Sequence, residues 1–322
     1  MVVHMSRSIV WIFAKLAIFA ALMAGSAAAQ ALFESRKITP IEEYTSGIEG
    51  PAVDAAGTLY VANFRKNGNI GRLNPGVMRS ELFAKLPDGS IGNGIRFDRD
   101  GRMYVADYKK HNVYVFERGQ SVPRVYFHSD RFNQPNDLAI AADGTLYASD
   151  PHFKRHTGQI WRITRGPDGK GRGEVMRSDE RKRMGTTNGI DLSPDGKTLY
   201  VSESETGELW AYGLQGAKLV VPRLVKKFDK PELDGLRTDV DGKIFVTRPP
   251  NGTVAVLEPD GKLVREIPLL GKVPTNLTFG GSDGRTVFVT QRVRERKTGF
   301  IEAFRVDRPG REPCLQVSGA AC

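Results

Sequence analysis

The residues of this chain best suited to chemistry are six oxygen-bearing side chains that recur at one position of a repeated sequence unit. Each unit has an aromatic residue at its centre, and Glu49, for example, stands 11 residues before Tyr60. The six are Glu49, Asn93, Asn136, Asn188, Asp234 and Asn276. Hard cations such as Ca²⁺ take six to eight oxygen ligands. Two carboxylates would balance a divalent charge and the amides would add neutral donors, so the pattern predicts a metal site.

An alternative is that five of the six residues only form turns. Asn and Asp before Gly are common in turns, because they tolerate left-handed backbone and bond to their own backbone. Glu49 has no such role in the sequence of residues 48–51 (IEGP). The alternative applies most to Asn93 and Asn276, which would then be turn residues or would support the site from outside.

The repeat predicts an all-β fold, a six-bladed β-propeller. The aromatic residues at the centres of the units are Tyr60, Tyr104, Tyr147, Tyr200, Phe245 and Phe288. Each unit contains alternating apolar segments separated by turn residues, and periods in the forties are typical of propeller blades. Because the innermost strands of such a ring line a central channel, the six polar residues are expected to meet at its mouth.

The two ends of the repeat predict how the ring closes. The last unit lacks a fourth strand after residues 301–306, whereas residues 37–44 precede Glu49 as the other fourth strands precede their polar residues. An N-terminal strand is therefore expected to complete the sixth blade, which would remove an exposed sheet edge. Residues 30–322 are expected to form one propeller domain with a short C-terminal tail.

Residues 1–29 have the features of a signal peptide. Arg7 and Lys15 precede an apolar run at residues 16–23, and alanines at 27–29 suit a cleavage site. The run is shorter than the roughly 20 residues that span a bilayer, so no stable membrane insertion is expected after cleavage; an uncleaved anchor is the alternative. The mature protein is expected to be periplasmic or secreted. In that environment Cys314 and Cys322 are expected to form a disulfide that pins the tail.

The charge of the chain does not indicate a nucleic-acid partner. The formal net charge is +10, but the basic residues are scattered or lie in mixed runs such as residues 292–297, interpreted as solvated surface. A nucleic-acid-binding protein would show one basic face and a recognisable module. A small-molecule partner is expected instead, and the protein is expected to be a monomer or a weak oligomer.

Several motifs around the polar residues occur in a fixed order. They are residues 49–51 (EGP), 132–138 (FNQPNDL), 149–151 (SDP), 187–190 (TNGI), 234–236 (DGL) and 274–281 (PTNLTFGG). This ordered set resembles the gluconolactonase / senescence-marker-protein family, regucalcin included. The resemblance implies a six-bladed propeller with one divalent cation at the channel mouth, Ca²⁺ first and Zn²⁺ or Mg²⁺ as alternatives, and hydrolysis of a lactone. By motif match Glu49, Asn188 and Asp234 would be metal ligands, and Asn136 would be a ligand or a substrate contact.

The resemblance also implies catalytic roles. A bound cation would polarise the lactone carbonyl and lower the pKa of a bound water. Asp234 matches the carboxylate proposed as the base, and Asp137, beside Asn136, would either share that role or orient the site. Some sugar-lactone members carry Arg two residues before the matched Asn. This chain has Gln134 there, which argues against a sugar-acid lactone.

Other functions and residues stay open at this stage. His152 is the histidine expected in a loop at the channel mouth, where it would contact substrate, although such a His is more often a plain surface residue. A non-catalytic ligand-binding or scaffolding propeller is one alternative function, because fold alone does not decide activity. A phosphotriesterase that uses the same cation is another.

Overall fold

The computed structural model describes residues 31–176, 181 and 183–316. The chain divides into two compact units, Met1–Leu32 and Phe33–Cys322, and the fold below is that of the second unit. The predicted signal peptide and Cys322 lie outside the described residues, so cleavage and the disulfide stay predictions. Among the helices of the described residues, none is both long enough and apolar enough to cross a membrane.

Four sheets contain four antiparallel strands each, paired in chain order. The first two are β6 (Gly92–Phe97), β7 (Met103–Asp107), β8 (Asn112–Phe116), β9 (Arg124–His128); and β10 (Leu138–Ile140), β11 (Leu146–His152), β12 (Thr157–Arg165), β13 (Gly171–Val175). The next two are β14 (Thr187–Leu192), β15 (Thr198–Glu203), β16 (Glu208–Gln215), β17 (Lys218–Lys227); and β18 (Leu236–Thr238), β19 (Ile244–Arg248), β20 (Thr253–Leu257), β21 (Leu263–Pro268). A 3₁₀ helix, η1 (Phe153–Arg155), follows β11.

A fifth sheet has eight strands and contains both ends of the repeat. Its order is β22-β23-β24-β2-β3-β4-β5, and β1 pairs with β24 beside this path. The strands are β1 (Arg36–Lys37), β2 (Tyr44–Val53), β3 (Leu59–Phe64), β4 (Asn69–Leu73), β5 (Glu81–Lys85), β22 (Pro274–Gly280), β23 (Thr286–Val293) and β24 (Thr298–Arg305). Residues 44–45 of β2 pair with β24, and Tyr44 and residues 49–53 pair with β3. The N-terminal segment therefore joins the last repeat unit to the first.

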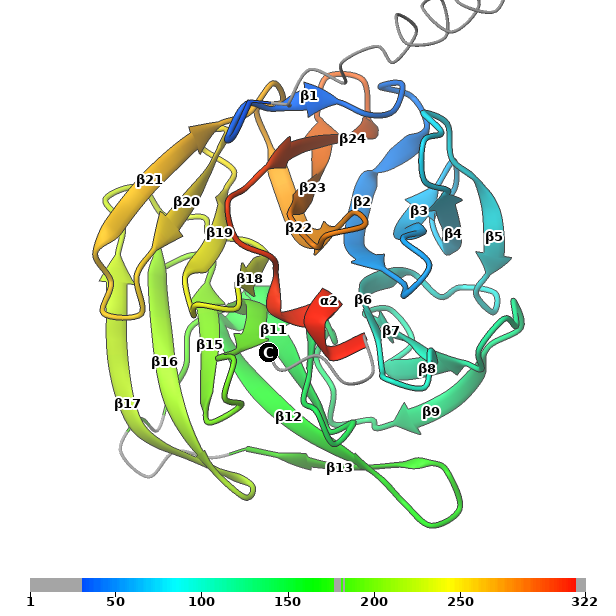
Figure 1. Cartoon of the computed structure of the whole chain (residues 1–322). Coiled ribbons are helices and arrows are strands. Elements are labelled where there is room, and N and C mark those ends of the chain that lie inside the picture. The colour runs from blue at the N-terminus through cyan, green and yellow to red at the C-terminus, as the bar shows by residue number, and fades with distance from the viewer. Residues whose placement is uncertain (1–30, 177–180, 182, 317–322) are drawn as a thin grey trace, which may run out of the picture. The chain divides into compact units, whose positions relative to one another are not determined.

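The sheets are arranged around a central axis, and the fold is an all-β propeller as predicted (Figure 1). The first strand of each repeat unit lies nearest the axis. These inner strands contact one another in a closed circuit, β2, β6, β10, β14, β18, β22 and back to β2. The circuit brings residues that are far apart in the sequence to one axis.

The hydrophobic core is divided among the interfaces between neighbouring sheets. The ring of Tyr60 on β3 packs at 5.2 Å from that of Phe97 on β6, and Phe245 on β19 packs at 5.1 Å from Phe279 on β22. The alternating apolar residues that predicted the strands fill these interfaces, because one side chain in two points to each face of a strand. This packing fixes the relative positions of the inner strands.

A short C-terminal helix, α2 (Arg311–Gln316), lies over the centre of the ring in Figure 1. Its first two residues are buried. Arg311 is 2 % exposed and pairs with Asp191 of β14 at 2.5 Å. Glu312 pairs with Arg96 of β6 at 2.8 Å. These ion pairs hold the start of α2 against two of the inner strands, independently of the predicted disulfide.

Replacing Arg311 by Ala is expected to lower the free energy of unfolding by about 3–5 kcal/mol, because it leaves the carboxylate of Asp191 buried without its cation. Urea unfolding followed by circular dichroism measures this change. Arg308→Ala is the matched control, since its pair with Asp241 is exposed and solvent screening is expected to leave it a much smaller contribution. Equal losses in the two variants would contradict the role of Arg311.

Candidate active site

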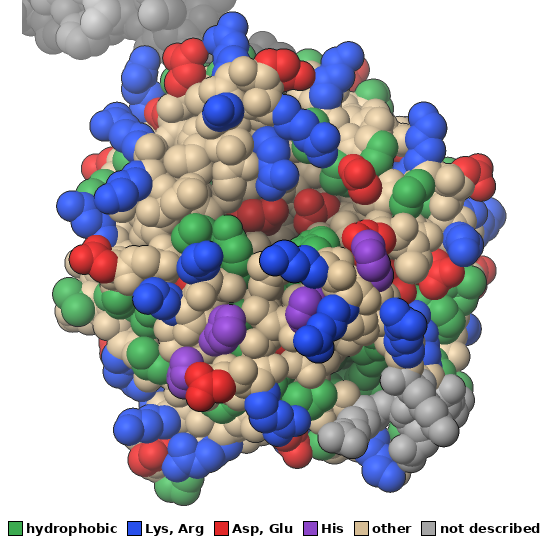
Figure 2. Space-filling view, turned by 180° about the vertical axis from the view of Figure 1, so that it is seen from behind, with side chains coloured by type: hydrophobic (Ala, Val, Ile, Leu, Met, Phe, Trp, Pro, Cys, Tyr) green, Lys and Arg blue, Asp and Glu red, His purple; other side chains and the backbone are tan. Residues whose placement is uncertain are grey.

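A cavity of about 370 Å³ brings together five of the six predicted oxygen-bearing residues. Its lining includes Glu49, Asn93, Asn136, Asn188 and Asp234. The face opposite to that of Figure 1 is hollowed near its centre, and acidic side chains are visible inside the hollow (Figure 2). A larger cavity, of about 990 Å³, is lined by none of the predicted site residues. The smaller cavity is therefore the candidate active site.

The secondary structure of these residues contradicts the turn interpretation. Glu49, Asn93, Asn188 and Asn276 lie within the strands β2, β6, β14 and β22. Asn136 and Asp234 stand two positions before the first residues of β10 and β18.

The glycines that follow the polar residues are explained by close approach of the inner strands. A side chain at Gly189 would overlap the carbonyl oxygen of Asp234, and one at Gly235 would overlap Oδ1 of Asn276. The amide of Gly189 donates a hydrogen bond to that carbonyl oxygen at 3.2 Å. Glycine at these positions therefore lets neighbouring inner strands approach closely at the axis. This close approach explains the glycines without a turn.

Two of the amide oxygens in the cavity have no hydrogen-bond partner among the described residues. They are Oδ1 of Asn93 and Oδ1 of Asn188, in side chains that are 8 % and 5 % exposed. A buried polar atom without a partner costs about 1–3 kcal/mol, and a bound cation would supply the partner. Within the described parts of the chain, no three His, Cys, Asp or Glu side chains are grouped to hold a metal. A fitting donor set is therefore two carboxylates with amide oxygens, which suits a hard cation.

Asn276 has a different role from the other five. Its Oδ1 accepts hydrogen bonds from the backbone amide of Leu277 at 2.9 Å and from Nη2 of Arg237 at 3.3 Å. Its Nδ2 donates to Oε2 of Glu49 at 3.4 Å. Its oxygen is therefore not free to bind a cation, and its amide nitrogen holds Glu49. Asn276 is not among the residues that line the cavity.

The two buried carboxylates of the cavity, Glu49 and Asp234, strongly disfavour being charged together. Burial raises the pKa of Glu49 to about 7, against the lowering effect of Arg292, and the negative charge of Asp137 raises it further. Burial also raises the pKa of Asp234 well above its usual range, and the charge of Glu49 is the next cause. Like charges in a site of low dielectric repel, so a cation between them would stabilise both ionised forms.

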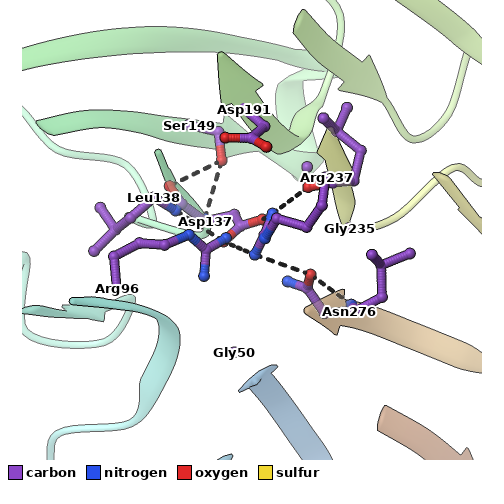
Figure 3. Close-up of polar contacts among 12 residues, drawn as sticks. Gly50, Arg96, Asp137, Leu138, Ser149, Asp191, Gly235, Arg237 and Asn276 are labelled. Carbon is purple, nitrogen blue, oxygen red and sulfur yellow. Dashed lines mark hydrogen bonds and ion pairs between the residues drawn. The ribbon is translucent and has the colours of Figure 1, made fainter. Parts of the chain in front are cut away.

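Asp137 lies outside the cavity and is held by two buried arginines (Figure 3). Its Oδ1 is 2.8 Å from Nη2 of Arg96, and its Oδ2 is 3.0 Å from Nη1 of Arg237. Oδ1 also accepts a hydrogen bond from the amide of Leu138 at 2.8 Å. Burial raises its pKa to about 6, and the charge of Arg96 opposes this. This geometry favours a positioning role for Asp137 over that of a base in contact with substrate.

Comparison with known proteins identifies the family. Residues 79–292 match the family described as SMP-30/Gluconolactonase/LRE-like region. The chain belongs to this family. It is 27% identical over 291 residues to a gluconolactonase of Zymomonas mobilis subsp. mobilis, covering 78% of this chain and 79% of that protein. It is 24% identical over 307 residues to diisopropyl-fluorophosphatase of Loligo vulgaris, covering 85% and 93%.

A solved structure shares the fold of this SMP-30/gluconolactonase-like chain. It is the calcium-binding protein regucalcin of Agrobacterium tumefaciens, with a TM-score of 0.68 and 19% identity. The alignment covers 85% of this chain and 97% of that protein. At this identity the likeness establishes the propeller architecture, as predicted, and leaves the metal and the substrate to be argued from the site.

Two further residues named from the sequence lie differently with respect to the cavity of the SMP-30/gluconolactonase-like site. Gln134, two positions before Asn136, lines the cavity. His152 is the last residue of β11, pairs with Thr157 and is not among the lining residues, although the adjacent Phe153 is. Contact of His152 with substrate stays a prediction.

Sequence reasoning missed Arg292 as a residue of the site. It belongs to the mixed run at residues 292–297, for which the sequence predicts solvated surface, yet it lines the cavity near the end of β23. Its position directly after the sixth repeat segment, residues 284–291, was the available signal. The corresponding residue Phe64 follows the first repeat segment and is buried in the core, so the repeat alone does not distinguish the two cases.

Proposed function

We propose that this protein is a divalent-metal-dependent hydrolase that opens a lactone at the mouth of the propeller channel. The observation that carries the proposal is the cavity in which Glu49 and Asp234 lie with the unpartnered Oδ1 of Asn188. The gluconolactonase name of the Zymomonas relative supports a lactone as substrate, and it supports including sugar-acid lactones despite the expectation drawn from Gln134. A scaffolding propeller would gain nothing from two buried carboxylates placed together on the axis.

We assign the cation to Glu49, Asn188 and Asp234, with Asn136 as a further ligand or substrate contact. Carboxylate and amide oxygens are ligands typical of Ca²⁺, whereas Zn²⁺ sites are built mainly from His and Cys. When bound, the cation polarises the lactone carbonyl and lowers the pKa of a water in the site. The choice of Ca²⁺ over Mg²⁺ or Zn²⁺ rests on this donor chemistry.

The remaining steps fall to side chains of the chain itself. Asp234 lines the cavity and is assigned as the base that accepts a proton from the attacking water. The water oxygen bonds to the carbonyl carbon, the ring carbon–oxygen bond breaks, and the proton passes to the leaving ring oxygen. The product is a hydroxy acid. Asp137, held by Arg96 and Arg237, is assigned to positioning the neighbouring Asn136, just before the inner strand β10.

The proposal is tested by removing the cation. Treatment with a chelator is expected to lower kcat/KM for D-glucono-1,5-lactone by about 100-fold or more, the scale of losing electrostatic stabilisation of an oxyanion, and Ca²⁺ is expected to restore it. Acid release with a pH indicator measures turnover, and elemental analysis measures bound metal. A protein with no bound or activating divalent ion would contradict the proposal.

The same assay separates the alternative functions. The Loligo relative is named a diisopropyl-fluorophosphatase, so a phosphotriester such as paraoxon belongs in the substrate panel. Faster turnover of the phosphotriester than of every lactone would favour that second function. A non-catalytic propeller would turn over neither class.

We also infer that the propeller has six blades and that the N-terminal strand closes the sixth. The circuit of six inner strands supports the count. The pairing of β1 and of residues 44–45 with β24 supports division of the eight-stranded sheet into two blades. A crystal structure with a different number of inner strands would contradict the count.

The localisation is likewise a proposal. We propose that the chain is exported and is periplasmic or secreted, because residues 1–29 combine a basic start, a short apolar run and a small-residue cleavage site. N-terminal sequencing of the mature protein is expected to begin at Gln30, and a sequence that begins at Met1 would contradict export by cleavage.

On a sizing column the mature protein is expected to run as a monomer or a weak oligomer.

A further inference from the structure

Arg292 places in the cavity a guanidinium that has no partner in the described part of the chain. It lies at the end of β23 and lines the cavity together with Glu49 and Asp234. Its backbone amide donates to the carbonyl of Val273 at 2.9 Å. Among the described residues, its guanidinium has neither a hydrogen-bond nor an ion-pair partner, and its Nε is buried. A guanidinium offers five donors in a fixed plane, so these donors are available to a ligand.

The other arginines near the axis are already engaged. Arg96 and Arg237 are 0 % and 1 % exposed and share the carboxylate of Asp137. Arg294 also lines the cavity, but its side chain is 61 % exposed and lies 4.0 Å from the carboxylate of Glu232 at the rim. Arg292 therefore differs from the second arginine of the cavity in both its depth and its free donors.

The charge of the lining argues for an anion beside Arg292. Glu49 and Asp234 together balance a divalent cation, and Glu232 balances Arg294. The charge of Arg292 is then left over in the site. Arg292 lowers the pKa of Glu49 and of Asp234, which shows that its charge is felt at both carboxylates. Among the described residues, its guanidinium makes a direct ion pair with neither carboxylate, and its donors are therefore free for a ligand.

We propose that Arg292 binds an anionic oxyacid group of the substrate, such as a carboxylate, and thereby selects lactones that carry a negative substituent away from the ring carbonyl. Planar guanidinium and carboxylate groups match in two parallel hydrogen bonds, which gives both affinity and orientation. The cavity of about 370 Å³ lies within the range of small-molecule sites. This inference rests on the proposed lactonase function and names its substrate class.

The test compares two lactones that differ only at C6. D-glucaro-1,4-lactone carries a carboxylate there, and D-glucono-1,4-lactone carries a neutral hydroxymethyl group. The native protein is expected to prefer the glucaro compound in kcat/KM by about 10-fold or more, the scale of one charge-assisted hydrogen-bonded pair. Arg292→Gln is expected to remove most of that preference, and Arg292→Lys to keep part of it. Arg294→Gln, the matched control at the rim, is expected to keep the ratio within about threefold.

Binding of the products keeps the test independent of turnover. Calorimetry in the presence of Ca²⁺ is expected to show tighter binding of D-glucarate than of D-gluconate, and Arg292→Gln is expected to abolish the difference. If neither lactone is opened while this difference persists, the proposed reaction fails and the anion site stands. Equal binding of the two acids, or equal losses on both lactones in Arg292→Gln, would overturn the inference. Thermal unfolding of each variant checks that it is folded.

Discussion

A chain in which Glu49 is replaced by Gln and Asp234 by Asn is expected to bind no divalent cation and to lose lactone turnover by about 1,000-fold or more. The substitutions keep the shape of both side chains but remove the two negative charges that balance the cation. Loss of a single electrostatic element at an oxyanion typically lowers kcat by about 10²–10³, and this variant removes the cation and the base together. Calorimetric titration with Ca²⁺ and the acid-release assay measure the two effects.

Glu232→Gln is the matched control for this variant. Glu232 also lines the cavity, but its side chain is 55 % exposed and lies at the rim near Arg294. Its substitution is expected to change cation affinity and kcat/KM by no more than about threefold, because exposed charges are screened by solvent. Retention of a stoichiometric cation in the double variant would place the metal elsewhere. Retained turnover without the cation would refute a metal-dependent reaction.

Because folding raises the pKa of both carboxylates, the double variant is also expected to unfold at a higher temperature than the cation-free native protein. The two neutral side chains remove a repulsion that the native protein relieves only by binding a cation or protons. Thermal unfolding at pH 8 with and without Ca²⁺ measures this: Ca²⁺ should stabilise the native protein and leave the variant unchanged. A variant less stable than the cation-free native protein would contradict repulsion as the cause.

Replacing Asp137 by Leu is expected to destabilise the protein by about 3–5 kcal/mol, the second large effect. The substitution leaves the buried guanidiniums of Arg96 and Arg237 without the carboxylate that they share. Glu312 offers partial compensation, at 2.8 Å from Arg96 and 3.9 Å from Arg237. Urea unfolding measures the loss, and the Arg308→Ala variant supplies the surface-pair reference.

Asp137→Asn distinguishes a positioning residue from a base. Asn keeps the shape of the side chain but cannot accept a proton. If Asp137 is a positioning residue, the Asp137→Asn variant is expected to have a lower free energy of unfolding and a higher KM. Its kcat is expected to fall by less than about 10-fold. A loss of kcat beyond about 100-fold with unchanged stability would instead favour Asp137 as a base, the role that the sequence left open for it beside Asp234.

Much of the fold could be predicted from the repeat, because each strand of a unit is a segment of alternating apolar residues between turn residues. The inner position of residues such as Asn93 and Asn188 followed from the same register. The site was harder to predict, since Asn followed by Gly is as typical of a turn as of a ligand at the channel mouth. The close approach of neighbouring inner strands, which explains Gly189 and Gly235, is a contact between segments that the sequence does not place side by side.

The sequence by itself determined the all-β repeat, the family resemblance and the six oxygen-bearing residues of the repeat, five of which line the cavity. These are encoded locally, in the period of apolar residues and in short ordered motifs. Only the tertiary structure decided which oxygens lack partners and that Asn276 donates a hydrogen bond to Glu49. It also decided that two arginines hold Asp137 and that Arg292 lines the cavity. Each of these depends on distances between different sheets, and such distances are set by the packing at the interfaces that close the ring.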